Sequence, residues 1–164
     1  MAYQKLQVGL AADVITSDTI DIPLPSSENL TGATTSTSAS KLDDTNVDFT
    51  AIQGLHAGAI VVNTDTQTIA TVTAVDSATV LSLSADIFVS VTFLENYIIY
   101  LDPTANHSEG CVLWVDQAAA VKVKTTSGSI VTYQGISAGT FLPVQVIRVY
   151  TTGTTAALNL IANW

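Results

Sequence analysis

The chain has 164 residues, of which 48% are hydrophobic and only 12% are charged, and its formal net charge is −9. Only five residues are cationic, so the sequence lacks the cluster of cations that binds phosphate backbones, and direct nucleic-acid binding is not expected. No apolar run approaches the roughly 20 residues of a membrane helix, and no membrane partner is expected. The single cysteine, Cys111, excludes an intrachain disulfide.

Low charge together with a mean hydropathy of +0.42 is unusual for a protein surface that meets only water. Either the surface is covered by Thr, Ser, Asn and Gln, or part of it is buried in an assembly. We favour the assembly, because surface that forms a permanent interface does not need charge. Residues 1–7 also lack the apolar core of a secretory signal.

The first quarter of the chain combines short strand-like stretches with a polar segment. Strands are expected at 3–10 and 13–15, and residues 19–22 alternate polar and apolar before an extended exit between two prolines, Pro23 and Pro25. Residues 26–40 are almost all small or polar. This composition predicts a linker between modules.

Residues 41–101 are predicted to form a β module of their own. The expected strands cover 57–62, 69–75, 80–84 and 96–101, and turns are expected at 63–67 and 76–79. Short strands at this spacing are typical of a small barrel or sandwich.

After a polar loop at 102–110, further strands are expected at 111–115, 120–124 and 130–133. Val121 and Val123 alternate with Lys122 and Lys124, which predicts one apolar and one basic face.

The last stretch, residues 140–164, reads as a strand, a tight threonine-rich connection at 151–155, and a second strand that ends on Trp164. We expect Trp164 to be packed rather than mobile, because the chain ends on this large aromatic without a charged tail.

The predicted fold class is therefore all-β. Residues 1–25 and 102–164 are expected to form one discontinuous β-sandwich or barrel, with 26–40 as linker and 41–101 as an inserted barrel-like module.

The sequence offers little chemistry, and we expect neither an enzyme nor a bound metal or cofactor. His56 and His107 lack further ligands at metal-site spacing, and Cys111 is expected to be a small buried hydrophobe. The acidic residues Asp43, Asp44 and Asp48 resemble a calcium loop only loosely, since the central glycine and final glutamate are missing. Residues 135–139 mimic a Gly-x-Ser-x-Gly motif, but they read as a turn.

Several segments resemble small structural proteins of tailed bacteriophages, especially marine and cyanobacterial ones. The resemblance is carried by Gly110-Cys-Val-Leu-Trp-Val115, Val121-Lys-Val-Lys-Thr-Thr-Ser-Gly128, Val131-Thr-Tyr133, Phe141-Leu-Pro-Val-Gln-Val-Ile-Arg-Val-Tyr150 with the threonine-rich residues to Ala156, Ala2-Tyr-Gln-Lys-Leu-Gln-Val8 with Asp21-Ile-Pro23, and the middle runs 70–79 and 81–88. Within that class, head decoration (cement) proteins fit the size and the β content. This resemblance implies a homotrimer on the outer surface of the virion head, bridging major capsid proteins against the pressure of packed DNA.

A tail, neck or fibre-associated protein that binds host glycans is the alternative. Trp114 or Tyr133 would then stack on a sugar, although a core position is favoured for both because each interrupts an apolar run. We assign interface or structural roles to Arg148, Tyr150, Trp164 and Trp114. Arg148, the only arginine, is expected to pair with a carboxylate within or between subunits.

Overall fold

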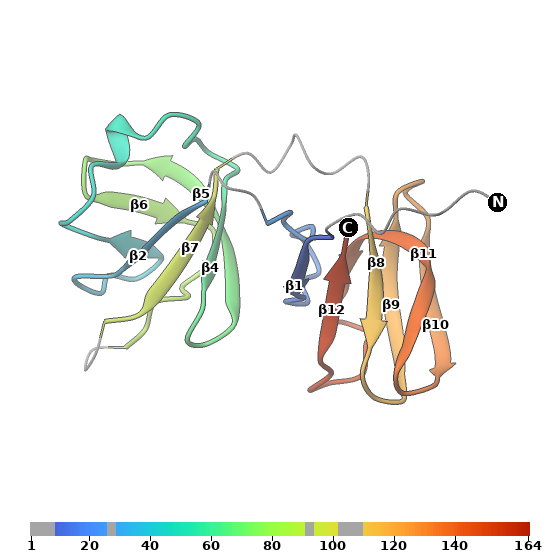
Figure 1. Ribbon diagram of the computed structural model, residues 1–164. Helices are drawn as coiled ribbons and strands as arrows, with labels where there is room; N and C mark the ends of the chain where they lie inside the picture. Colours follow the sequence, from blue (N-terminus) through green and yellow to red (C-terminus); the bar gives the residue numbers. More distant parts are fainter. Residues whose placement is uncertain (1–8, 26–28, 91–93, 102–109) are drawn as a thin grey trace.

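The computed structural model describes residues 9–25, 29–90, 94–101 and 110–164, and in this part of the chain the protein is all-β. The described residues form twelve strands and one short 3₁₀ turn at Phe49–Ala51. All strand pairs are antiparallel, and the strands divide into two six-stranded sheets (Figure 1). The predicted fold class is therefore confirmed.

One sheet, which we call the terminal sheet, combines strands from both ends of the chain. It consists of β1 (Ala11–Asp13), β8 (Cys111–Val115), β9 (Ala119–Thr125), β10 (Ile130–Ile136), β11 (Thr140–Val149) and β12 (Leu160–Asn163). The strand order is β1-β12-β8-β11-β9-β10. Blue β1 thus lies beside red β12 in Figure 1, because Ala11 pairs with Asn163 and Asp13 with Ile161.

The other sheet, the middle sheet, is built from the central part of the chain. It consists of β2 (Leu30–Ala33), β3 (Lys41–Asp43), β4 (Ile60–Asn63), β5 (Thr68–Val75), β6 (Val80–Leu83) and β7 (Asn96–Tyr100), in the order β2-β7-β4-β5-β6-β3. Its two edges approach each other, since Thr35 donates its N–H to the carbonyl of Asp43 at 2.7 Å and Ser36 forms an isolated bridge to Asp43. The middle sheet is therefore curled into a half-barrel.

Each sheet encloses a separate apolar core, as alternation along the strands requires. In the middle sheet the core includes Phe49, Val61 and Ile99, and in the terminal sheet it includes Leu113 and Val123. All five side chains are at most 1% exposed. Burial of these apolar faces stabilises each sheet.

The segment 26–40 contains a strand as well as polar loop residues, so its reading as a linker alone was wrong. Leu30–Ala33 forms β2 and pairs with β7, placing Thr31 opposite Ile98. Small residues were read as a loop signal, but here a small residue has a packing role. A Cβ atom on Gly32 would lie 2.4 Å from the Tyr97 hydroxyl oxygen, so only glycine fits beside that ring.

The threonine-rich connection near the end of the chain also differs from the prediction. Strands β11 and β12 are not neighbours, because β8 lies between them, and the connection spans residues 150–159 rather than a tight turn. Thr154 and Thr155 instead continue the ladder on β9: their hydroxyl oxygens accept hydrogen bonds from the N–H groups of Lys122 (3.0 Å) and Ala120 (2.9 Å). Their side chains thus satisfy backbone donors after β11 has ended.

The opening strand lies two residues earlier than expected. Residues 1–8 lie outside the described part, so most of the strand predicted at 3–10 does not enter the comparison, and the strand expected at 13–15 is found at Ala11–Asp13. Residues 19–22 form no strand, although the N–H of Ile22 donates to the carbonyl of Ile147 at 2.8 Å. The segment therefore runs beside β11 without forming a strand ladder.

Strand β4 is buried on both of its faces. Val61 points into the middle core, whereas Ile60 and Val62 point the other way and are still only 2% and 6% exposed. Val62 lines a cavity of about 220 Å³ together with Ile15 and Pro23 from the first segment of the chain. The continuous apolar run of β4 is therefore explained by burial on both sides.

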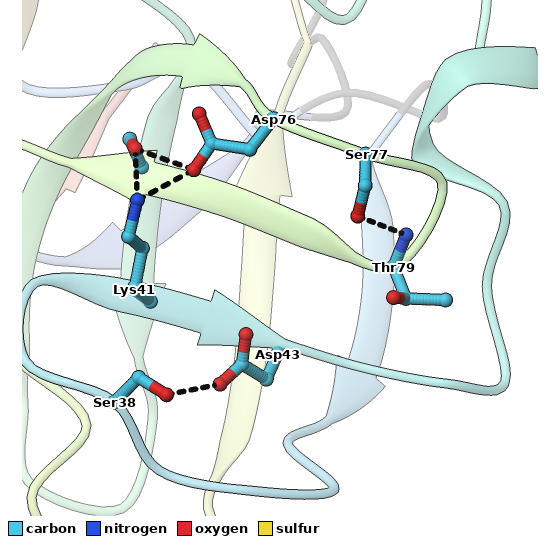
Figure 2. Close-up of polar contacts among 7 residues, drawn as sticks. Ser38, Lys41, Asp43, Asp76, Ser77 and Thr79 are labelled. Atoms are coloured by element: carbon cyan, nitrogen blue, oxygen red, sulfur yellow. Dashed lines mark hydrogen bonds and ion pairs between the residues drawn. The ribbon is translucent and has the colours of Figure 1, made fainter.

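The outer side of the middle sheet carries polar contacts between strands (Figure 2). Lys41 Nζ on β3 lies 2.5 Å from Asp76 Oδ2 and donates to Ser82 Oγ on β6 at 2.6 Å. Ser38 donates to the carboxylate of Asp43 at 2.8 Å, and the N–H of Thr79 donates to Ser77 Oγ at 3.2 Å. Of these contacts, those of Lys41 tie the short strand β3 to β6, and they contribute little to stability because they are partly exposed.

Candidate functional site

The outer face of the terminal sheet follows from simple alternation along its strands. On β8, Cys111, Leu113 and Val115 are buried in the core, so Val112 and Trp114 point to the opposite side. The same alternation turns Ile161 of β12 outward, because its neighbours on both sides are buried. The terminal sheet therefore has an outer face that its own core does not cover.

Three large apolar side chains form a row across this outer face, which we call the apolar row. Trp114 of β8 is paired with Phe141 of β11 on one side and with Ile161 of β12 on the other. Phe141 is 56% exposed and Ile161 36% exposed, while Trp114 is partly exposed between them. Directly paired residues lie on the same face of a sheet, so the three side chains are neighbours.

The two aromatic rings of the apolar row are held in a defined geometry. The ring centroids of Trp114 and Phe141 are 4.9 Å apart with an interplanar angle of 66°, an edge-to-face contact. Such pairs contribute roughly 0.5–1.5 kcal/mol beyond their buried area. The apolar row is therefore ordered before any partner binds.

Beyond the apolar row, the far end of β11 carries a polar cluster around Arg148. Its guanidinium donates from Nε to Asp21 Oδ1 at 2.5 Å and from Nη1 to the carbonyl of Asp18 at 3.0 Å. This pairing of Arg148 with a carboxylate confirms the prediction made from the sequence. Both partners of the Arg148–Asp21 pair are 17% exposed at the side chain, so the contact is more than a loose surface pair.

The ring of Tyr150 contacts two cations of this cluster. The ammonium of Lys122 is 4.9 Å and the guanidinium carbon of Arg148 is 5.8 Å from the centre of the Tyr150 ring, both within cation–π range. Thr152 binds the carboxylate of Asp18 with its hydroxyl (2.7 Å) and its N–H (3.0 Å). These hydrogen bonds from Thr152 lower the pKa of Asp18, since they favour the ionised carboxylate.

The four residues assigned from the sequence thus occupy different places. Trp114 belongs to the apolar row, and Arg148 and Tyr150 belong to the polar cluster, while Trp164 is partly buried against the core. The N–H of Trp164 donates to the carbonyl of Leu10 at 3.0 Å, so the end of the chain is fixed to its beginning. The expectation that Trp164 is packed is confirmed.

The core position favoured for Trp114 was wrong, because a tryptophan inside an apolar strand can lie on either face. Tyr133, which was expected in the core on the same argument, does pack partly buried against it. Phe141 and Ile161 were missed as site residues. Alternation indicated that they point outward, but only the pairing of three distant strands places them beside Trp114.

A second recess lies between β1 and the connection 150–159. It has a volume of about 560 Å³ and is lined mainly by short polar and small side chains, among them Asp13, Thr16, Thr151, Thr154 and Asn159. The hydroxyls of Thr151 and Thr154 already take part in hydrogen bonds to Thr16 and to Lys122 N–H. These two threonine hydroxyls therefore hold the connection 150–159 in place.

Cys111 is a buried residue, as its sequence context predicted. It is 2% exposed, and its thiol donates to the carbonyl of Val146 with an Sγ–O distance of 3.3 Å. Burial raises the pKa of the thiol to about 12, because the thiolate would be poorly solvated. The reactive thiolate is thus disfavoured at neutral pH.

The acidic candidates and His56 form hydrogen bonds within the fold. Asp43 accepts hydrogen bonds from the hydroxyls of Ser36 and Ser38, Asp44 accepts one from the Tyr97 hydroxyl at 2.7 Å, and Asp48 accepts from Thr50. His56 is exposed and contacts the carbonyl of Gly54, while His107 lies outside the described residues. In the described ranges no group of three or more His, Cys, Asp or Glu side chains is arranged to hold a metal ion.

Comparison with known proteins adds no relative: no family description, no curated protein and no solved structure matches this chain. None of the described segments is a helix of the length and apolar character that crosses a membrane. The class of protein is therefore defined by its fold, an all-β chain with two antiparallel sheets, and its candidate site is the outer face of the terminal sheet.

Proposed function

We propose that this chain is a structural protein of a tailed-phage virion, a head decoration protein that bridges major capsid proteins on the outer surface of the head. The observation that carries the proposal is the apolar row of Trp114, Phe141 and Ile161 on an otherwise solvent-facing sheet. The sequence resemblance to phage structural proteins supplies the class of partner. The low charge of the chain supports the same role, because interfaces deplete charge at their centre.

The apolar row suits attachment to a repeated protein surface. Full burial of a side chain such as Phe141 contributes about 2 kcal/mol, so a few such residues give only modest affinity at each contact. A shell offers many equivalent positions, and an oligomer engaging several capsid proteins at once converts weak contacts into strong attachment. The apolar row itself carries no charge. It therefore adds no repulsion at the contact, although the chain has a net charge of −9.

The polar cluster has a supporting role in this proposal. Arg148 binds the segment around Asp18 and Asp21 to β11, and the ring of Tyr150 lies within cation–π distance of Lys122 and Arg148. Arg148 is thereby engaged within its own chain. Arg148 thereby keeps the border of the outer face rigid. A rigid border loses less conformational entropy when a partner binds.

Reconstitution on particles tests the proposal directly. Tailed-phage particles lacking this chain are mixed with purified wild-type protein or with Phe141→Ser, and bound copies are counted by quantitative gel. We expect the wild type to bind in copies on the order of hundreds and to raise the temperature at which heads rupture, as bridging across a shell requires. Phe141→Ser is expected to weaken binding at least about tenfold, since it removes roughly 2 kcal/mol of apolar burial.

The matched control is Gln145→Ala, which changes another exposed side chain of β11 outside the apolar row. It should bind like the wild type. Particles whose shell stability does not change when they carry the protein would contradict the cement role, and equal binding of Phe141→Ser would exclude the apolar row as the contact.

A tail, neck or fibre-associated protein that binds host glycans is the second candidate. It is favoured by one observation, the partial exposure of the Trp114 ring on the outer face, where a sugar could stack. Copy number separates the two candidates, because a tail or neck component is present in only a few to a few dozen copies. Saturable glycan binding that is lost in Trp114→Ala and kept in Gln145→Ala would support the second candidate.

A further inference from the structure

Among the described residues, strand β10 (Ile130–Ile136) is an edge strand of the terminal sheet. It pairs with β9 on one side, and no described strand pairs with its other side. Exposed edges in monomeric proteins are usually blocked by charged residues or proline, and β10 contains neither. Ile130 is 57% exposed and Val131 38% exposed, so the edge is also apolar.

The register shows which backbone groups of β10 face outward. The N–H of Thr125 donates to the carbonyl of Ser129 at 2.9 Å, and Val131 is paired with Val123 two residues further on. In antiparallel pairs, hydrogen-bonded and non-hydrogen-bonded positions alternate. Val131 and Tyr133 therefore bond to β9, whereas the N–H and C=O groups of Ile130 and Thr132 point away from it.

The side chains of β10 are complementary to a second copy of the same strand. If two copies run antiparallel with Thr132 on the two-fold axis, Thr132 faces its own copy, Val131 faces Tyr133, and Ile130 faces Gln134. Threonine pairs and pairs of aromatic with β-branched residues are favourable cross-strand neighbours. A two-fold contact requires this kind of self-complementary surface.

Charge also favours this edge for contact between identical chains. The net charge of −9 opposes self-association over most of the surface. The nearest charged side chains on the neighbouring strand are Lys122 and Lys124, whose partners in the register are Thr132 and Ile130. Two copies that meet along β10 thus bring together neutral strands without placing acidic groups opposite each other.

From these observations we propose that two copies of this chain associate by antiparallel pairing of their β10 edges, with Thr132 on the two-fold axis, forming one continuous sheet. The pairing is short, because the bulge between Tyr133 and Ile136, where Gly135 has a φ of 67°, ends the regular edge. One short strand buries less than a stable dimer interface. The expected dissociation constant is between about 10 μM and about 1 mM. This inference does not depend on the proposed virion role.

Sedimentation of the purified protein over a concentration series up to about 1 mM tests the pairing. The wild type should show reversible dimers. Thr132→Pro removes the outward N–H, and a proline is tolerated at such an edge position, so the dimer should weaken at least about tenfold while circular dichroism still reports a folded protein. The matched control Thr132→Val keeps both the N–H and the β-branched shape and should dimerise like the wild type.

Crosslinking tests the register independently of the proline variant. In Thr132→Cys the two introduced thiols meet across the axis and should form a covalent dimer on mild oxidation, whereas Gln134→Cys places them too far apart. The native Cys111 is buried and serves as a background common to both variants. A wild type that stays monomeric at the highest concentration, or equal crosslinking of the two cysteine variants, would overturn the proposal.

Discussion

The middle and terminal sheets have the same number of strands, but they differ in where they place their polar and apolar residues. In the described residues, five of the six buried polar side chains belong to the middle part of the chain: Thr34, Asp43, Asp44, Asn63 and Glu95. Five of the seven exposed large apolar residues instead belong to the two ends: Leu10, Ile130, Val131, Phe141 and Ile161.

The buried polar groups of the middle sheet satisfy one another. Asn63 donates to the carbonyl of Ile87 and to Glu95 Oε1, both at 2.8 Å, while its own oxygen accepts from two N–H groups of the following turn. Glu95 Oε2 accepts from the N–H of Ser90 at 2.9 Å. A satisfied network of this kind favours one arrangement of strands and turns, because any other leaves a buried group without a partner.

The terminal sheet differs both in its core and in its exposed residues. Its core is built almost entirely from aliphatic side chains, so its inner face is specified by shape and area rather than by hydrogen bonds. Its apolar row and its β10 edge remain exposed. The comparison therefore indicates that the middle sheet is specified by buried hydrogen bonds, whereas the terminal sheet carries the larger share of the exposed apolar residues.

The largest effect is expected from breaking the buried network of the middle sheet. Asn63→Ala removes four hydrogen bonds and leaves the carbonyl of Ile87 and one oxygen of Glu95 without this donor, which should cost about 3 kcal/mol of unfolding free energy. Urea unfolding measures the loss. Thr73→Ala on the exposed side of β5 is the control and should stay within about 0.5 kcal/mol. A similar value for both variants would show that the network does not stabilise the sheet.

A smaller effect is expected at the end of the terminal sheet. Trp164 is only partly buried, so Trp164→Ala should cost about 2 kcal/mol rather than the 3 kcal/mol or more of a fully buried tryptophan. The melting temperature measures this loss. Asn163→Ala is the adjacent control, since its side chain bonds only to carbonyl groups of its own sheet. An unchanged melting temperature in Trp164→Ala would refute its packing role.

The last effect is absent at neutral pH and separates the two sheets only at alkaline pH. The pKa of Cys111 is raised to about 12 in the terminal sheet, so the folded thiol stays neutral while the unfolded thiol ionises near its ordinary value of about 8.5. The unfolded state then binds fewer protons, and stability should fall by roughly 1 kcal/mol for each pH unit above about 9. Burial and the Asp44 carboxylate also raise the pKa of Tyr97 in the middle sheet, where the loss should begin only above about pH 10.

Thermal melts between about pH 8 and about pH 11 measure both contributions, since these values bracket the ordinary pKa of thiol and phenol. Cys111→Ala should remove the earlier loss, and Tyr97→Phe should flatten only the later one. If Cys111→Ala has the same alkaline profile as the wild type, the thiol is not the group that titrates.

Much of the fold could be predicted because strand alternation and turn residues are local. The strand Cys111–Val115 was predicted with its observed bounds, and the turn at 63–67 follows from the side chain of Asn63, which accepts hydrogen bonds from the next N–H groups. The errors arose where one residue type serves two purposes. Gly32 was read as part of a linker, although it is the position where the ring of Tyr97 needs space in a strand.

The candidate site was predictable only in part. Arg148 was expected to find a carboxylate because a lone guanidinium in an apolar strand needs one, but the sequence did not indicate which of fourteen acidic residues it would be. Its partner, Asp21, is 127 positions away in the chain. Likewise, nothing local joins Trp114 to Phe141 and Ile161.

The sequence by itself thus determined the all-β class, the spacing of the strands, the alternation of their faces and the low charge that suits an interface. The tertiary structure alone decided the strand order β1-β12-β8-β11-β9-β10, and with it the apolar row and the position of β10 at the edge of the described sheet. The physical reason is that alternation is fixed by the geometry of each strand, whereas pairing between distant strands is selected by the combined burial and hydrogen bonding of the whole sheet.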